Sequence, residues 1–164
     1  YLFCCMFLGS MILGALLPIP IEMDIKKSIA NDVDNVGGII VNNLLVCTGI
    51  ASGVFLFCIP TILMTIYNGI LLGLTIDNGI GKYGLYHTLK SLAAHSIFEL
   101  PAITIAAIIG FLPISILIGV LRTKKFNFNI YFKSILLLLT LMLIFIIVAA
   151  FVEYYITFPL MGTR

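Results

Sequence analysis

Histidine and glutamate side chains occur inside a strongly apolar sequence, where they could do chemistry if they meet. His95 and Glu99 are four residues apart, so on a helix they would share one face. Glu153 stands near the end of the last apolar block. Charged groups at membrane depth are costly, so they face the protein interior, pair with one another or line a water-filled cavity. We therefore predict a buried polar site comprising His95, Glu99, Glu153, Asn42, Asn43 and Asn68.

Metal binding and nucleophilic catalysis are two chemistries to weigh for this set. A metal site needs at least one more ligand, for which His87 and Glu153 are the evident candidates, and the chain has no His-Glu-x-x-His pair. A nucleophile, Ser91 or Ser96 with His95, would have neither a Gly-x-Ser-x-Gly elbow nor a placed acid. We therefore predict no catalytic residue, no bound metal and no cofactor.

A proton or ion relay and a purely structural contact are the other two interpretations. Intramembrane His and Glu residues often mark proton or ion pathways. The interpretation we favour is a polar clasp that fixes the register of the helices and satisfies the backbone groups freed at Pro101. Under this interpretation the polar residues hold the bundle together and do not run a reaction.

The composition places all of these residues in a membrane protein. Of the 164 residues, 62% are hydrophobic and 10% are charged, whereas roughly 25% are charged in an average soluble domain. Such a chain has too little polar surface for a water-soluble domain, and intrinsic disorder requires low hydrophobicity. The net charge of +2 provides no basic field for nucleic acid. We predict an all-α fold, a polytopic transmembrane helix bundle whose solvent is the lipid bilayer.

Apolar blocks divide the chain into about five membrane segments. We expect 1–17 to be a first spanning helix, truncated if Tyr1 is not the native start, and 18–38 to be a polar extracytoplasmic connector. The membrane domain then covers 39–160, with its apolar blocks at 39–76, 91–121 and 134–152. The block 39–76 is far longer than the ~20 residues of a single crossing.

Three prolines are expected to break these helices. Pro60 lies near the middle of 39–76, so we predict two short helices in a tight hairpin, or one crossing plus a re-entrant segment. Pro101 and Pro113 interrupt the fourth block. There we place 91–99 at the membrane interface or folded back into the membrane, with the crossing at about 100–121.

Glycines four residues apart predict close helix packing in the suspected hairpin. Gly49 and Gly53 lie in its first arm, and Gly69 and Gly73 lie in its second. Small residues at this spacing let helix backbones approach closely in lipid. They could form the face of a homo-oligomer, but we favour packing of the two arms within one chain.

Basic residues indicate the orientation in the membrane. The loop 122–133 holds four of them and no acid, which predicts that it is cytoplasmic, because Lys and Arg accumulate in cytoplasmic loops: Arg122, Lys124, Lys125 and Lys133. With five crossings, 18–38, 77–94 and the C-terminus then lie outside. If 39–76 crosses the membrane only once, the predicted orientation of the N-terminal half is inverted.

Four motifs in this order resemble the stage II sporulation protein M family. The longest is the string His-Ser-Ile-Phe-Glu-Leu-Pro-Ala-Ile from His95 to Ile103, and members usually have Gly where this chain has Ser96. The other three are Asn42-Asn43, then Tyr67-Asn68-Gly69 followed by Gly73, and Phe151-Val152-Glu153 with Pro159. The resemblance covers about residues 40–160.

The resemblance implies a multi-pass protein of the bacterial cell membrane without a known enzymatic activity of its own. The sporulation member resembles a scaffold that anchors cell-wall hydrolases, a lytic transglycosylase and an amidase–endopeptidase, during septal remodelling. Other relatives lie in circular bacteriocin clusters beside an ABC-type ATPase, where they are thought to serve export or immunity.

Two functional hypotheses follow from the residues and the resemblance together. In the first, the chain is a non-catalytic membrane subunit or scaffold that organises partner proteins. In the second, it is the membrane subunit of an ABC-type exporter or immunity system for an antimicrobial peptide. The chain contains no Gly-rich phosphate loop, so any ATPase must be another chain. The connector 18–38 is small for docking a soluble partner, which moves the expected partner contacts into the membrane.

Overall fold

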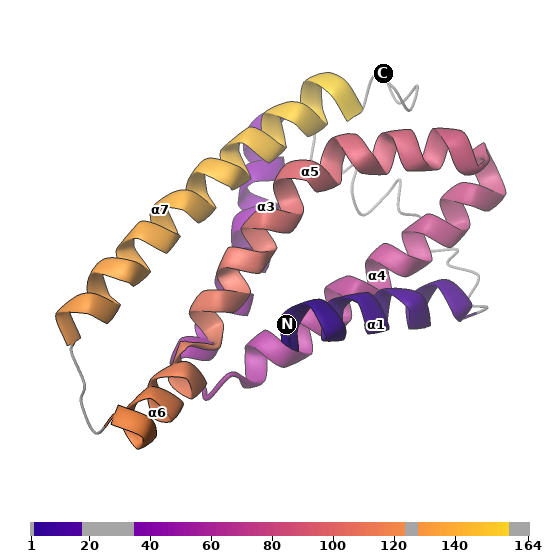
Figure 1. Ribbon diagram of the computed structural model, residues 1–164. Helices are drawn as coiled ribbons and strands as arrows, with labels where there is room; N and C mark the ends of the chain where they lie inside the picture. Colours follow the sequence, from indigo (N-terminus) through magenta and orange to yellow (C-terminus); the bar gives the residue numbers. More distant parts are fainter. Residues whose placement is uncertain (1, 18–34, 124–127, 158–164) are drawn as a thin grey trace.

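Helices make up every regular element in the part of the chain that the structure describes (Figure 1). The structure is a computed structural model that describes residues 2–17, 35–123 and 128–157. The predicted connector 18–38 lies almost wholly outside the described residues. The elements are α1 (Leu2–Leu16), α3 (Val36–Ala51), η1 (Ser52–Val54), α4 (Ile59–Tyr83), α5 (Leu85–Gly110), α6 (Leu112–Thr123), α7 (Phe128–Val152) and the π-helical η2 (Glu153–Thr157). The prediction of an all-α bundle is confirmed.

The block around Pro60 folds as a helical hairpin. Helix α3 begins at an Asn35 cap, whose side chain accepts a hydrogen bond from the Gly38 backbone N–H. After η1 the chain reverses through Phe57 and Cys58, which both have positive φ. Pro60 is the second residue of α4, where its missing N–H costs no helical hydrogen bond. Two antiparallel helices therefore meet at a tight turn.

The stretch 77–94, which was predicted to be an outer connector, is helical on both sides of a single residue. Helix α4 continues to Tyr83, and α5 begins at Leu85. Between them Gly84 takes a φ of 80°, a left-handed value that glycine adopts without steric cost. The polar residues of this region include Asp77 and Lys82, and both lie within α4.

Pro101 lies in the interior of a helix, whereas Pro60 and Pro113 are each the second residue of one. The helix that contains Pro101 is the 26-residue α5, which changes direction along its length (Figure 1). A proline in a helix frees the carbonyl four residues earlier, here that of Ile97, and bends the helix at that turn. The actual break is at Phe111, just before Pro113, and the axes of Ser96–Gly110 and Leu112–Arg122 differ by 47°.

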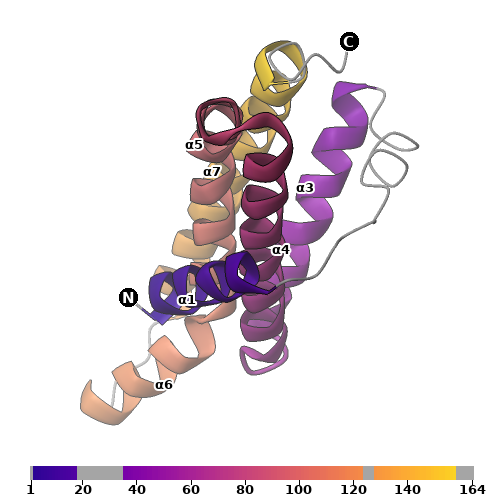
Figure 2. The same ribbon diagram turned by 90° about the vertical axis from the view of Figure 1, so that its right-hand side faces the viewer.

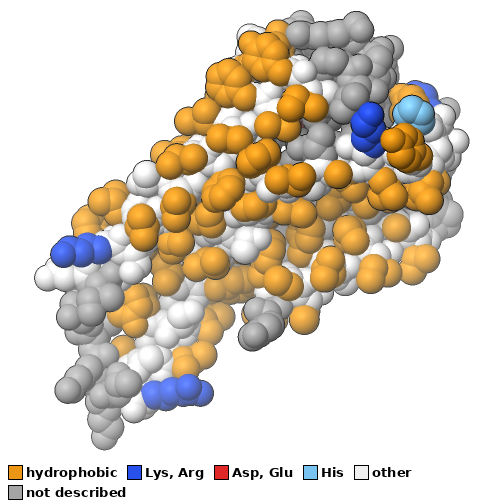
Figure 3. Space-filling view, turned by 45° about the horizontal axis from the view of Figure 1, so that its top comes forward, with side chains coloured by type: hydrophobic (Ala, Val, Ile, Leu, Met, Phe, Trp, Pro, Cys, Tyr) orange, Lys and Arg blue, Asp and Glu red, His pale blue; other side chains and the backbone are white. Residues whose placement is uncertain are grey.

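The core lies where α3, α5 and α7 pack together, and α1 lies against α4 outside this group (Figure 2). Small side chains on α5 and α7 let the helices approach closely. The buried core residues are Cys47, Ile50, Ala51, Ala102, Ile103, Ala106, Ala107, Ile109, Met142 and Ile146. The described surface along the bundle is covered with apolar side chains, and Lys and Arg side chains lie near its two ends (Figure 3). This distribution suits a molecule surrounded by lipid.

Three of the described helices are long and apolar enough to cross a membrane, and a fourth span results if the bent pair α5–α6 counts as one. The three are Val36–Val54, Ile59–Tyr83 and Tyr131–Ile156. Helix α1 has 15 residues, which corresponds to about 22 Å of helix against a hydrocarbon core of about 30 Å. The predicted number of about five membrane segments therefore resolves into up to four spans and a short apolar helix.

Candidate functional site

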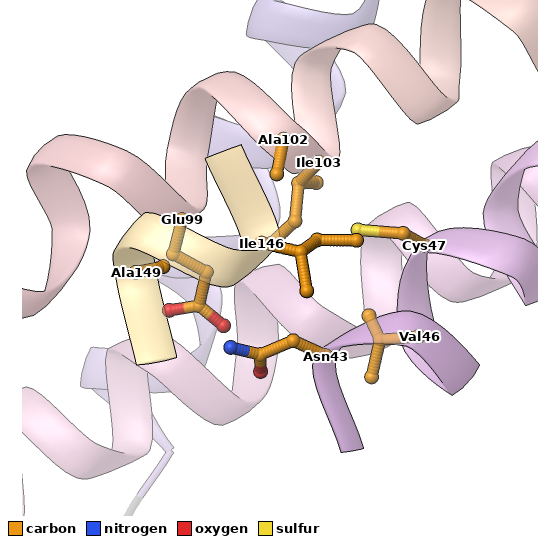
Figure 4. Close-up of a pocket in the computed structure, with 8 residues that line it drawn as sticks. All are labelled: Asn43, Val46, Cys47, Glu99, Ala102, Ile103, Ile146 and Ala149. Carbon is orange, nitrogen blue, oxygen red and sulfur yellow. The ribbon is translucent and has the colours of Figure 1, made fainter. Parts of the chain in front are cut away.

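A carboxylate and a carboxamide from different helices face each other inside the bundle. Glu99 of α5 and Asn43 of α3 point toward one another (Figure 4). Six further residues enclose the pair, and they come from α3, α5 and α7: Val46, Cys47, Ala102, Ile103, Ile146 and Ala149. The site is thus assembled from three segments that are far apart in the sequence.

Helical spacing explains why these residues share one site. On α3, Asn43, Val46 and Cys47 follow the i, i+3, i+4 pattern of one helix face. On α5, Glu99, Ala102 and Ile103 repeat the same pattern. On α7 the site receives Ile146 and Ala149, three residues apart. Ala102 and Ala149 are small, which lets the helices approach closely around the polar pair.

The interior of the site is nearly closed. Asn43 is only 5% exposed, and its Nδ2 atom makes no hydrogen bond to any residue in the described ranges. Burying an amide without a partner is unfavourable, and the carboxylate that Asn43 faces is the kind of acceptor that would satisfy it. The described lining leaves no room for a water molecule between the side chains. The two polar groups therefore face each other across a described lining that holds no solvated passage.

Comparison with known proteins identifies the group to which the chain belongs. The family model described as stage II sporulation protein M matches residues 2–158. The chain belongs to the stage II sporulation protein M family. The match extends beyond the resemblance over 40–160 and includes α1. A relative from Methanocaldococcus jannaschii (strain ATCC 43067), the uncharacterized protein MJ0793, is 32% identical over 139 residues, which cover 83% of this chain and 78% of that protein. No solved structure matches.

In this family member the structure brings together only part of the predicted polar set. Glu99 and Asn43 line the same site and face one another, and Glu153 follows Ala149 by four residues in η2, a segment that packs against α5. His95 lies one helical turn before Glu99 on α5, and its side chain is outside the described part of the structure.

The other two asparagines of the set lie elsewhere. Asn42 is exposed on α3. Asn68 lies on α4, where its side-chain Nδ2 donates a hydrogen bond to the backbone carbonyl of Met64 at 2.7 Å. A polar residue in an apolar helix can thus be satisfied by its own helix, which the sequence pattern alone does not distinguish from contact with a neighbour.

Two buried threonines of this family member escaped the sequence analysis. Thr61 and Thr65 of α4 are both fully buried. The Thr61 hydroxyl donates a hydrogen bond to the Ile50 carbonyl at 2.7 Å and so ties α4 to α3 at the hairpin. The Thr65 hydroxyl has no hydrogen-bond partner among the described residues. Their spacing of four directly after Pro60 is the signal that could have found them.

The four predicted glycines contact helices of the same chain. A Cβ on Gly49 would collide with Met64, and one on Gly53 would collide with Thr61, so both glycines of α3 pack on α4 as expected for the two arms. Gly69 and Gly73 instead pack on α1, where a Cβ would collide with Ser10 and Met11. The second arm therefore uses its glycines for a helix that the sequence analysis did not connect with it.

The described residues contain no group of three or more His, Cys, Asp and Glu side chains placed to hold a metal ion. The site that the described residues form is therefore a carboxylate, a carboxamide and the Cys47 thiol within an apolar lining.

Proposed function

We propose that this chain is a non-catalytic membrane subunit that organises partner proteins in a bacterial membrane complex. Membership of the stage II sporulation protein M family supports a role in the membrane. The scaffold role comes from the family resemblance and from the nature of the site. The partners would be cell-wall hydrolases or other subunits of the same complex.

The observation that carries this proposal is that Asn43 and Glu99, from different helices, face each other within one closed lining. A catalytic or conducting site needs space for a substrate, an ion or water, and the described lining offers none at this pair. A buried polar contact between helices specifies which faces meet, because each group is costly when left without its counterpart. The proposed role of the pair is to hold α3, α5 and α7 in the register that presents the outer faces to partners.

We further propose that the loop 122–133 is cytoplasmic and that the chain crosses the membrane several times. The basic cluster of this loop supports that orientation. If α3, α4, the bent pair α5–α6 and α7 each cross, the hairpin turn near Phe57 lies on the cytoplasmic side, and Asn35, Gly84 and η2 lie outside. Labelling of single cysteines at Lys124 and at Gly84 with a membrane-impermeant reagent tests this, in a background from which the native cysteines are removed.

The decisive experiment replaces Glu99 by Gln and measures assembly. We expect E99Q to lower the amount of protein in the membrane and the amount of partner recovered in a mild-detergent pull-down, in proportion to each other. The control is N42Q, a change at an exposed position next to Asn43. An E99Q protein that assembles with its partners normally but loses function in the cell would contradict the scaffold proposal.

The second candidate is the membrane subunit of an ABC-type exporter or immunity system for an antimicrobial peptide. The feature that supports it is the 47° bend between α5 and α6, because broken helices are typical of transporters. Recovery of an ATPase in the same pull-down, with a turnover that responds to a peptide, would favour this candidate. Recovery of peptidoglycan hydrolases would favour the scaffold.

A further inference from the structure

An open apolar groove lies where α5 ends and α6 begins, beside the N-terminal end of α1. It has a volume of about 290 Å³. Its walls come from three helices: Leu2 and Phe3 of α1, Ile108 of α5, Phe111 at the break, and Ile114 and Ser115 of α6. Ser115 contributes the one hydroxyl of the lining, and this group already donates to the Phe111 carbonyl. The lining therefore suits a hydrocarbon chain.

The groove exists because α6 leaves the bundle. The break at Phe111 directs α6 away from α5, and α6 projects past the end of the core (Figures 1 and 2). Four apolar residues of α6 are exposed at the spacing i, i+3, i+4, i+7, and they form one stripe: Ile114, Leu117, Ile118 and Leu121. The groove thus continues onto an apolar helix face that the described part of the chain leaves uncovered.

A basic group stands at the far end of this helix. Arg122 follows Ser115 by seven residues, two turns or about 10 Å along α6, so the two lie near the same face. Arg122 is exposed and forms no ion pair with the described residues. Between Glu99 and Glu153 the sequence has no acidic residue but four basic ones. The positive charge at this end of the bundle is therefore not offset by nearby acids.

We propose that an anionic phospholipid binds here, with an acyl chain in the groove and its phosphate at Arg122. The geometry suits a lipid: the apolar groove lies toward the bundle and the cation lies at its periphery, as headgroup and chain do in a leaflet. Clusters of Lys and Arg beside a membrane helix attract anionic headgroups. The site is independent of the Asn43–Glu99 contact and of the proposed scaffold role.

The test measures lipid binding to the full chain in detergent after lipid removal. Phosphatidylglycerol is titrated, with phosphatidylcholine and inorganic phosphate as comparison ligands, and binding is followed by native mass spectrometry. We expect phosphatidylglycerol to bind more tightly than phosphatidylcholine, and phosphate alone not to bind. R122Q should lower the affinity for phosphatidylglycerol about fivefold, because one cation near a membrane surface contributes about that much to the binding of an anionic headgroup. K90Q, a charge removal at an exposed position near the start of α5, is the matched control.

A second variant fills the groove and leaves the charge in place. I114W should reduce binding of both phospholipids, since it acts on the acyl chain. Equal binding of the two lipids by the unchanged protein, or equal losses in R122Q and K90Q, would overturn the proposal. A change in oligomeric state in I114W with unaltered lipid binding would also overturn it, and would assign the groove to a second copy of the chain.

Discussion

Replacing either Asn43 or Glu99 alone should lower the free energy of unfolding more than replacing both together. We consider N43L, E99L and the double variant, which replace the polar groups by apolar ones of similar size. In N43L the half-buried Glu99 carboxylate loses the carboxamide that it faces, and in E99L the buried Asn43 loses the carboxylate, in a lining without room for water. Leaving a buried polar group without its counterpart costs about 1–3 kcal/mol, whereas an apolar replacement of both groups can be nearly neutral.

The coupling between the two sites can be bounded from the structure. Interhelical hydrogen bonds in membrane proteins average about 0.6 kcal/mol in double-mutant cycles and reach about 1.7 kcal/mol. Asn43 is 5% exposed but its Nδ2 makes no hydrogen bond to the described residues, so we expect a coupling no larger than this average, about 0.6 kcal/mol. Because a cycle isolates the pairwise contribution, other contacts of Glu99 cancel.

The assay is reversible unfolding in mixed micelles with increasing dodecyl sulfate, applied to the original chain, the two single variants and the double variant. A parallel cycle with N42L and E99L is the control, since Asn42 is exposed on the same helix. Free energies that add within about 0.3 kcal/mol in the Asn43 cycle would refute the contact, because independent sites behave in that way.

Three further predictions concern packing and bending. T61V should lower the free energy of unfolding by about 1 kcal/mol, because it removes the buried hydrogen bond to the Ile50 carbonyl. T140V removes an exposed hydrogen bond to Leu136 within α7 and should change this free energy little. Equal effects of the two variants in the same unfolding assay would argue against a stabilising role of the Thr61–Ile50 hydrogen bond. G73L should displace α1 from α4, because a side chain at this position meets the backbone of Met11. The control is G9L, whose side chain points into open space. The protease sensitivity of α1 is compared in the two variants, and an α1 that stays protected in G73L would exclude the proposed packing. P101A should restore the hydrogen bond to the Ile97 carbonyl and straighten α5. The distance between spin labels at the exposed residues Leu89 and Leu117 should then increase. An unchanged distance would assign the bend to helix packing instead.

The fold class and the hairpin at Pro60 could be predicted because they depend on composition and on the strongest helix signals. Lipid removes most alternatives for an apolar chain, and a proline near the middle of an over-long block leaves few arrangements. Pro101 shows the limit of this approach, since a proline can either end a helix or bend it. Which outcome occurs depends on whether the helix on each side is held by packing, and the sequence does not report that.

The candidate site could be predicted only in part for a related physical reason. Glu99 and Asn43 were found because a polar group in lipid has few ways to be satisfied. Asn68 carried the same signal, but it bonds to its own helix at Met64. Thr61 has a short side chain that is compatible with an apolar helix, so the sequence pattern did not distinguish it from its apolar neighbours. Contacts between distant segments, such as Gly73 with α1, have no local signature.

The seam between α1 and α4 has a consequence for biogenesis. Phe7 lies at Gly69 and Met11 lies at Gly73, so the two helices run in the same direction, and α1 leaves the ribosome well before the helix that receives it. The face of α4 that carries Gly69 and Gly73 can receive α1 only after α4 itself has been made. The same face of α4 could accept α1 of a neighbouring copy. High expression would therefore favour dimers in which the two chains exchange their first helices.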